Sequence, residues 1–365
     1  MKVTPWDVSG EIDYNKLVKD FGATLIDEKI KKRLKTPLLK RGNYFSHRDF
    51  DKWLEAYDKK KIISVITGRG PSEKMHLGHL IPFLAAKSLQ EEFNCKVFIP
   101  ISDDEKFFVK EDLNFNKVLE YSKENILDII ALGFKVNETF IFEDFIYTDI
   151  YKYAAQIAKR ITYSTAKATF GLKTENNIGW SFYPAIQIAH ILFPQFYLGK
   201  HISVVPVGID QDPFIKLARD IATHKDFKLE KPAALHAKFI PSLFGNIKMS
   251  SSGEGVIFLT DSPSEVKRKI NKYAFSGGQS TIKEHRKKGG NPDIDISFQY
   301  LKIFFEQDDK RLEKIYYNYK NGTLLSGELK IILIEKINAF LAEHQKNREE
   351  AKRSIDKFII KNSIR

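Results

Sequence analysis

The sequence predicts an α/β fold built on a doubly wound parallel sheet, with a helical insertion and an all-α C-terminal region. Three observations predict it. Short, continuously apolar segments alternate with helical patterns between residues 62 and 227, as is typical of strands buried on both faces of a parallel sheet. A long stretch of mostly helical pattern separates the second of these segments from the last. Beyond Pro263 the strand pattern ends and long helical patterns follow.

The expected strands are rich in β-branched residues, and they cover 62–67, 95–102, 139–144 and 201–210. An amphipathic helix follows the first strand at 76–93, and another follows the last at 212–227. Strand, turn and helix repeated in this way indicate a Rossmann-type domain, in which ligands bind at the carboxyl ends of the strands.

The domain organisation follows from the same patterns. We expect residues 1–60 to form an N-terminal appendage that packs on the sheet domain. Residues 61–262 would form that domain, with the helical insertion at about 105–200. Residues 263–365 would form a helical domain, whose last helix returns toward the sheet.

Charge and composition limit the class of protein. Lys and Arg number 59 against 47 Asp and Glu, giving a net charge of +12. From Asp261 to Arg365 there are 22 basic and 15 acidic side chains, so +7 of this charge lies in the helical region, which favours a polyanionic partner there. The single cysteine, Cys95, excludes a disulfide framework and a cysteine zinc site. There is no signal-like leader and no apolar run near ~18 residues, so we expect a cytoplasmic protein without a membrane span.

The segment "PSEKMHLGH" (71–79) places His76 and His79 three positions apart. A zinc-protease pair needs histidines four apart with a glutamate after the first, whereas Leu77 occupies that place, so we expect no metal site. A dinucleotide fingerprint also fails, because its third glycine position holds Glu73.

A phosphate cradle fits this segment better. An expected strand ends at Thr67, a Gly/Pro loop follows, and a helix begins near His76. The exposed N–H groups and the dipole of such a helix attract anions, and Gly78 allows a flat ring to approach the backbone. Far along the chain, Lys248 precedes a serine cluster in "IKMSSSGEG" (247–255). A mobile lysine beside hydroxyl groups suits a leaving pyrophosphate.

"MHLGH" and "KMSSS" resemble the HIGH and KMSKS signatures of class I aminoacyl-tRNA synthetases. "SHRDF", "TGRGPSEKMHLGHLIPF", "SDDEK", "YPAIQ", "GIDQDPF", "AFSGG", "EHRKKGGNPDIDISFQYL" and "SGELK" resemble, in this order, the archaeal and eukaryotic tryptophanyl-tRNA synthetases. The resemblance runs from about residue 43 to the end of the chain.

The resemblance implies that L-tryptophan is activated with ATP and Mg²⁺ and then transferred to tRNA(Trp). It also implies a homodimer formed through the insertion, and anticodon contacts from the helical domain. The implied catalytic residues are His76, His79, Lys248, Ser250 and Ser252. ATP would be held by Thr67, Gly68, Arg69, Gly78, Lys106, Asp210, Met249 and Ser251. The amino acid would be held by Glu105, Gln187, Gln211, Gly208, Ile66 and His190.

The same resemblance raises the choice between tryptophan and tyrosine. Related tyrosine enzymes read the phenol hydroxyl with a tyrosine and an aspartate at the places of Ile66 and His190, which argues against tyrosine. Eukaryotic tryptophan enzymes usually have a tyrosine at the place of Ile66 and a glutamine near that of Pro100, and these two residues are thought to hold the indole N–H. Both places are apolar here, so the resemblance does not identify the acceptor of the indole N–H. We hypothesise that His190 or a backbone carbonyl supplies it, with a purely structural His190 as the alternative. A tyrosine ligase, an inactive tRNA-binding paralogue and a small-molecule adenylyltransferase stay open as other functions.

Overall fold

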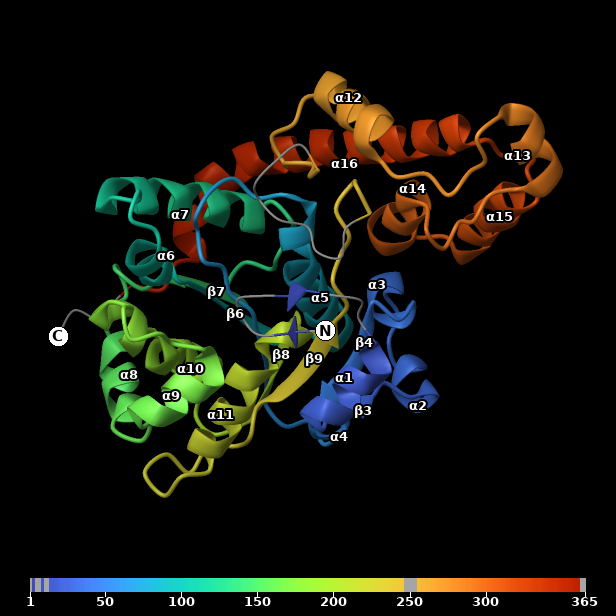
Figure 1. Ribbon diagram of the computed structural model, residues 1–365. Helices are drawn as coiled ribbons and strands as arrows, with labels where there is room; N and C mark the ends of the chain where they lie inside the picture. The colour runs from blue at the N-terminus through green and yellow to red at the C-terminus, as the bar shows by residue number, and fades with distance from the viewer. Residues whose placement is uncertain (1, 4–7, 10–12, 246–254, 362–365) are drawn as a thin grey trace.

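The centre of the computed structural model is a seven-stranded sheet (Figure 1); the structure describes residues 2–3, 8–9, 13–245 and 255–361. The strand order is β3-β4-β9-β8-β5-β6-β7. From β9 to β7 all strands are parallel, whereas β3 and β4 pair antiparallel at one edge. The α/β class is therefore confirmed, with a mixed rather than wholly parallel sheet. The strands are β3 (Thr24–Leu25), β4 (Tyr44–Arg48), β5 (Ile63–Ile66), β6 (Lys96–Ile101), β7 (Thr139–Glu143), β8 (Ile202–Gly208) and β9 (Ala233–Ala237).

Strands β5, β6, β7 and β8 match the four strands expected from the sequence. Strands β3, β4 and β9 were not expected. The sequence of β9 is AALHA, which lacks the β-branched residues that mark a strand, and β4 becomes a strand by pairing with β9. Residues 24–48 thus extend the sheet instead of lying outside it, and a separate pair, β1 (Lys2–Val3) with β2 (Val8–Ser9), precedes them.

Side chains alternate between the two faces of the sheet, and helices cover both faces. Val65 and Val97 pack on one face with α4 (Phe50–Asp58), α5 (Leu77–Phe93) and α7 (Phe115–Ile130). Ile66 and Phe98 face the other side. The helices on that side are α8 (Ile150–Ala158), α9 (Tyr163–Phe170), α10 (Ile178–Leu198) and α11 (Asp212–Ala222). The helix expected at 212–227 therefore ends five residues earlier than the pattern predicted.

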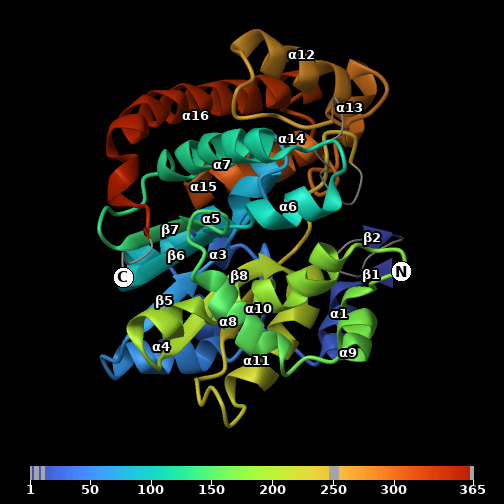
Figure 2. The same ribbon diagram turned by 90° about the vertical axis from the view of Figure 1, so that its left-hand side faces the viewer.

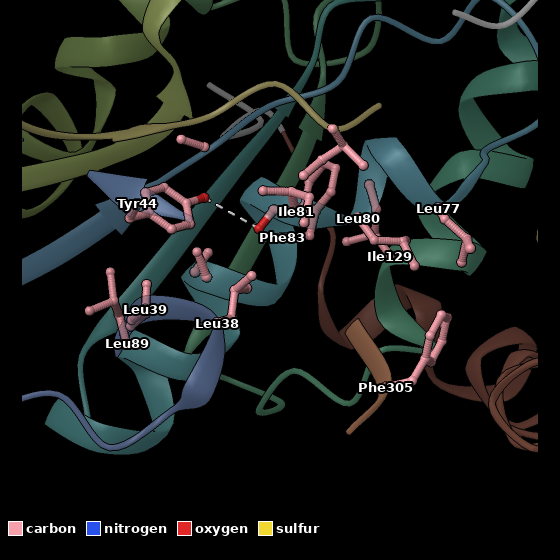
Figure 3. Packing of buried hydrophobic residues seen from close by; sticks show 14 of the residues in the cluster. Leu38, Leu39, Tyr44, Leu77, Leu80, Ile81, Phe83, Leu89, Ile129 and Phe305 are labelled. Carbon is pink, nitrogen blue, oxygen red and sulfur yellow. Dashed lines mark hydrogen bonds between the residues drawn. The ribbon is translucent and has the colours of Figure 1, made fainter. Parts of the chain in front are cut away.

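Helix α5 lies at the centre of the larger core, as Figure 3 shows. Leu77, Leu80 and Phe83 are at most 1% exposed, and the Tyr44 hydroxyl of β4 donates a hydrogen bond to the Ile81 carbonyl over 3.3 Å. This packing fixes the first turn of α5 against the sheet. The N-terminal segment adds α1 (Tyr14–Phe21), α2 (Glu28–Lys31) and α3 (Pro37–Lys40).

The C-terminal region is helical from residue 263 onward, and its last helix returns along the sheet domain. Figure 2 shows α16 beside α7, where His344 Nε2 lies 3.3 Å from Asp128 Oδ1. Beyond it, Ile141 of β7 donates to the Phe358 carbonyl and accepts from Ile360 N–H, both over 2.8 Å. The helices are α12 (Pro263–Tyr273), α13 (Ile282–Lys288), α14 (Ile296–Tyr300), a π-helix (Leu301–Phe305), α15 (Asp309–Lys320) and α16 (Ser326–Ser354). Within the described ranges, no helix combines the length and apolar character needed to cross a membrane.

Candidate active site

A cavity of about 440 Å³ opens at the carboxyl ends of β5, β6 and β8, with α10 along one side. This is the place where an open α/β sheet binds its ligands. It contains ten of the residues proposed from the sequence: Ile66, Thr67, Gly68, Arg69, Glu105, Lys106, Gln187, His190, Gly208 and Gln211. Its lining also includes Gly70, Pro82, Pro100, Ser102, Tyr183, Ile191, Val205, Pro206, Val207 and Phe214.

The remaining proposed residues lie elsewhere. His76, Gly78 and His79 form the first turn of α5, next to the cavity rather than in its lining. Asp210 lies beneath Gly208, where a Cβ atom would stand 2.4 Å from Asp210 Oδ1. A larger residue at position 208 would therefore have to displace the Asp210 carboxylate. Residues 248–252 (Lys248, Met249, Ser250, Ser251 and Ser252) lie outside the described part of the chain.

The two histidines build the start of α5 with their Nδ1 atoms. His76 is the N-cap, and its Nδ1 accepts from Gly78 N–H over 3.1 Å, while His79 Nδ1 accepts from His76 N–H over 3.2 Å. Their rings stack with centroids 3.6 Å apart. Because each Nδ1 is an acceptor, the proton of each neutral ring is on Nε2. His76 Nε2 is buried and has no hydrogen-bond partner among the described residues, so it is available to a ligand oxygen.

Both rings are neutral near pH 7. Burial, with the charge of Arg69 adding to it, lowers the pKa of His76 to about 3. Burial and the charges of Arg69, His76 and Lys106 lower the pKa of His79 well below its ordinary value. The site therefore presents neutral N–H donors beside fixed cations, an arrangement that suits the oxygens of a polyphosphate.

The loop after β5 continues the hydrogen bonding of the sheet. Arg69 N–H donates to the Pro100 carbonyl over 3.0 Å, and Ser102 N–H donates to the Arg69 carbonyl over 2.8 Å. Arg69 Nε donates to Asn125 Oδ1 of α7 over 3.0 Å. A Cβ atom on Gly68 would lie 2.9 Å from the Pro100 carbonyl oxygen, so only glycine allows the two strands to approach this closely.

Acidic and amide groups occupy the other walls. Glu105 is in α6 (Asp103–Val109), and its Oε1 atom lies 2.6 Å from Lys106 Nζ. On α10, the Tyr183 hydroxyl donates to Gln187 Oε1 over 2.6 Å, and the Trp180 ring stacks on Tyr183 at 5.6 Å. Tyr183 was not singled out from the sequence, although its place four residues before Gln187 puts both side chains on one helix face.

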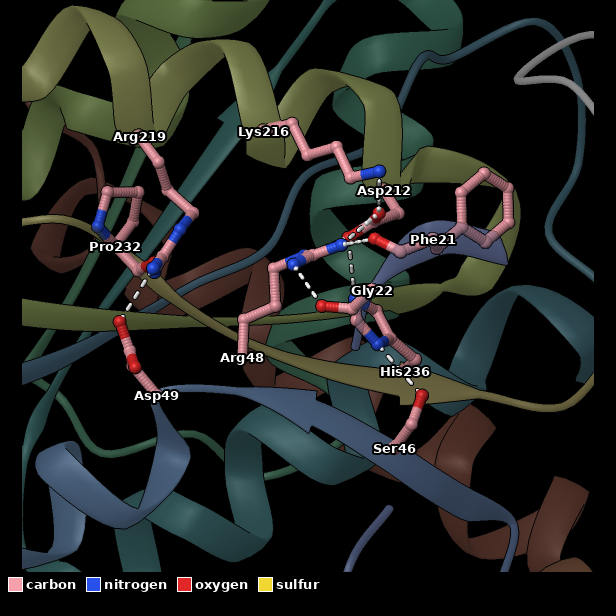
Figure 4. A network of polar contacts seen from close by, with 10 residues as sticks. All are labelled: Phe21, Gly22, Ser46, Arg48, Asp49, Asp212, Lys216, Arg219, Pro232 and His236. Atoms are coloured by element: carbon pink, nitrogen blue, oxygen red, sulfur yellow. Dashed lines mark hydrogen bonds and ion pairs between the residues drawn. The ribbon is translucent and has the colours of Figure 1, made fainter. Parts of the chain in front are cut away.

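A buried ionic network holds the start of α11 beside the cavity (Figure 4). Asp212 is fully buried, and its carboxylate accepts from Arg48 Nε over 2.6 Å and from Arg48 Nη2 over 2.7 Å. His236 Nε2 lies 3.2 Å from the same carboxylate. Burial alone would raise the pKa of Asp212, but the hydrogen bonds from Arg48 and the nearby His236 outweigh it and hold the pKa at about 2. Asp212 therefore stays ionised and fixes the start of α11, which carries Phe214 and directly follows Gln211.

Among the described residues, one group has the spacing of metal ligands. Asp103, Asp104 and Asp144 each place a carboxyl oxygen within 4.8 Å of the other two. All three are buried. Burial and the neighbouring Asp104 raise the pKa of Asp103 to about 7, and burial with the charge of Asp144 raises the pKa of Asp104 well above its ordinary value. These carboxyl groups thus hold protons readily, and Asp144 contacts His190 of the cavity.

The comparisons with known proteins agree with this geometry. Residues 58–342 match the family described as tRNA synthetases class I (W and Y). The chain belongs to this family. It is 50% identical to the tryptophan–tRNA ligase of Sulfolobus acidocaldarius, over 98% of this chain and 94% of that protein.

Solved structures of the family superpose closely on this fold. A product-bound parasite tRNA synthetase has a TM-score of 0.91 and 43% identity, covering 95% of this chain and 96% of that one. The tryptophanyl-tRNA synthetase of Aeropyrum pernix has a TM-score of 0.87 and 34% identity, covering 96% and 97%. The sheet and the helical C-terminal region of this synthetase thus follow the family architecture.

Proposed function

We propose that the chain is a tryptophan–tRNA ligase, which converts L-tryptophan and ATP to tryptophanyl-adenylate and pyrophosphate and then charges tRNA(Trp). The observation that carries the proposal is a nearly full-length match to tryptophan–tRNA ligases, in a chain whose cavity at the sheet edge lies beside the first turn of α5 with His76 and His79. The reaction requires no protein nucleophile, because the carboxylate of the amino acid attacks the α-phosphorus of ATP and pyrophosphate leaves in line. Catalysis then rests on positioning and on stabilisation of the developing charge.

On the ATP side, the Nε2–H groups of His76 and His79 are proposed to donate to the triphosphate. Mg²⁺, entering with ATP on its phosphates, would neutralise part of their charge. The groups described at the cradle are N–H donors and cations, which suit phosphate oxygens better than a metal ion. The other residues proposed to hold or close on ATP are Thr67, Gly68, Arg69, Gly78, Lys106, Asp210, Lys248, Met249, Ser250, Ser251 and Ser252.

On the amino-acid side, Glu105 is the proposed partner of the ammonium group. Its side chain lies at the cavity wall and is nearly buried, so an ammonium ion placed there gains a charge-assisted hydrogen bond with little competition from water. The other proposed contacts are Gln187, Gln211, Gly208, Ile66 and His190.

Glu105→Gln is expected to raise the KM for tryptophan by roughly tenfold to a hundredfold, because a hydrogen bond to a charged group is lost while the side-chain volume stays. The KM for ATP should change far less. Steady-state ATP–pyrophosphate exchange measures both constants when each substrate is varied in turn while the other is saturating. The neighbouring exposed Glu111→Gln is the matched control, and equal effects of the two substitutions would contradict the assignment.

Amino-acid-dependent ATP–pyrophosphate exchange tests the proposed function itself. We expect exchange with tryptophan alone among the proteinogenic amino acids, because Ile66 and His190 line the cavity and stand where the resemblance to tyrosine enzymes implies a tyrosine and an aspartate that read the phenol hydroxyl. Exchange with tyrosine would identify a tyrosine ligase, and exchange with none would identify an inactive tRNA-binding paralogue.

We further propose a cytoplasmic homodimer formed through the insertion at about 105–200. In the structure, this segment is interrupted by β7, which joins the main sheet. The domain division at residues 60 and 262 stays a prediction. Residues 263–365 carry a net charge of +8, since Asp261 lies outside this range, and a cationic helical surface of this kind supports contacts with tRNA phosphates.

A further inference from the structure

His190 lines the cavity and has one ring nitrogen without a hydrogen-bond partner among the described residues. It lies on α10, it lines the cavity, and its ring packs against Phe142 of β7 with centroids 5.9 Å apart. Its Nε2 is 2.8 Å from Asp144 Oδ1. Its Nδ1 is buried and meets no hydrogen-bond partner within the described ranges. One nitrogen is thus anchored by the protein and the other is available to a bound molecule.

The anchor determines which nitrogen is the acceptor. Burial lowers the pKa of His190 to about 4, so the ring is neutral near pH 7 and carries a single N–H. With that N–H on Nε2, Asp144 accepts it and Nδ1 keeps a free lone pair. The opposite tautomer would leave a buried N–H unpaired, which is rare in folded proteins. Burial raises the pKa of Asp144, yet even a protonated Asp144 keeps Oδ1 as an acceptor when the proton resides on Oδ2.

The cavity that His190 lines also has apolar side chains that suit an aromatic ring. Ile66, Pro100 and Phe214 line the same cavity and offer no side-chain hydrogen bond. An indole has a single donor and no strong acceptor, so one acceptor such as Nδ1 satisfies its N–H. A phenol hydroxyl also needs a donor for its oxygen, which neither the Nδ1 lone pair nor the side chains of Ile66, Pro100 and Phe214 provide.

We propose that His190 Nδ1 accepts the indole N–H of bound tryptophan, and that Asp144 is the positioning residue that holds the required tautomer. This inference rests on the proposed function of the chain. His190 Nδ1 would then serve as the indole acceptor in a pocket where Ile66 and Pro100 provide none. The buried Asp144 would contribute to substrate selection by holding the tautomer.

The test compares tryptophan with its benzothiophene analogue, in which sulfur replaces the indole N–H. In ATP–pyrophosphate exchange, the wild-type chain should favour tryptophan in kcat/KM by about 10- to 100-fold, because the analogue leaves Nδ1 unpaired. His190→Leu should bring this ratio to about one, because residue 190 then accepts no hydrogen bond from either substrate. An unchanged ratio would assign the indole N–H to a backbone carbonyl. An equal loss for both substrates would make His190 a structural residue only. Either result overturns the inference.

Nuclear magnetic resonance of ¹⁵N-histidine-labelled wild-type protein tests the tautomer without any substitution in the measured sample. The His190 signals, assigned by their loss in His190→Leu or in the more conservative His190→Gln, should show a protonated Nε2 and a bare Nδ1. Tryptophan should shift the Nδ1 resonance and the analogue should not. A protonated Nδ1 in the free protein would overturn the inference.

Asp144→Leu tests the positioning role. Without the anchor, the two ring nitrogens should share the proton, so their resonances move toward each other and the preference for tryptophan falls. Retention of one tautomer with an unchanged preference would remove Asp144 from the inference. A wild-type chain that shows no tryptophan-dependent exchange would instead contradict the proposed function, so the two failures are distinguishable.

Discussion

His76→Asn is expected to lower kcat of tryptophan-dependent ATP–pyrophosphate exchange by about 100- to 1000-fold, as observed when one preorganised donor to a developing oxyanion is removed. The asparagine side chain keeps the N-cap, since its oxygen accepts from the first-turn N–H as His76 Nδ1 does. It removes the buried Nε2–H that we assign to the phosphate. Pre-steady-state adenylate formation separates this chemical step from product release.

His76→Ala provides the matched comparison, because it removes the cap as well as the donor. We expect His76→Ala to lose kcat to a similar extent. It should also lose about 1 kcal/mol of folding stability, which His76→Asn retains because it keeps the cap. The KM for tryptophan should stay nearly unchanged in both variants, since His76 lies outside the cavity lining. Less than a tenfold effect of His76→Asn on kcat would contradict the assigned role of Nε2–H.

Arg48→Leu should cost about 3–5 kcal/mol of folding free energy, because it leaves the buried Asp212 carboxylate without its main partner. Urea unfolding at pH 7 measures this loss. Asp212 also begins α11, so we expect a higher KM for tryptophan through displacement of Gln211 and Phe214. The exposed pair of Arg33 and Asp58 has similar bidentate geometry, and Arg33→Leu should cost less than about 1 kcal/mol.

The pH dependence of stability should show whether lost charge pairing causes the destabilisation in Arg48→Leu. The pKa of Asp212 is held at about 2 in the folded chain, below its ordinary value of 3.8. The network therefore stabilises the fold above about pH 4 and loses its effect as the pH falls through about 2. The stability gap between wild type and Arg48→Leu should shrink over that range. A gap that is constant with pH would show that lost packing, not charge pairing, causes the destabilisation.

The sequence predicted the central strands and α5 well, because their apolar runs and their turn residues are local signals. Strands β4 and β9 could not be recognised, since AALHA has little strand propensity and is a strand only through partners far along the chain. Tertiary pairing overrides local propensity in such cases.

In the candidate site, too, residues in local motifs were predicted, whereas contacts between distant segments were not. Residues within recognisable motifs, such as Thr67, Glu105 and Gln187, were predicted to act together, and the fold brings them to one cavity. Asp144 was not predicted, because its contact with His190 joins residues 46 positions apart on different elements. The roles of Nδ1 and Nε2 in His76 also required the observed cap geometry.

The pairing of residues 358–360 with Ile141 has a consequence for solubility. Strand β7 is the outermost strand of the main sheet on that side, and an uncovered strand of this kind attracts strands of other molecules. The short segment after α16 takes up the outward hydrogen bonds of Ile141, while the opposite border ends in β3, which is only two residues long. Residues 358–360 thus occupy the middle of β7, where a strand of another molecule would otherwise pair, and so oppose association at this edge of the sheet.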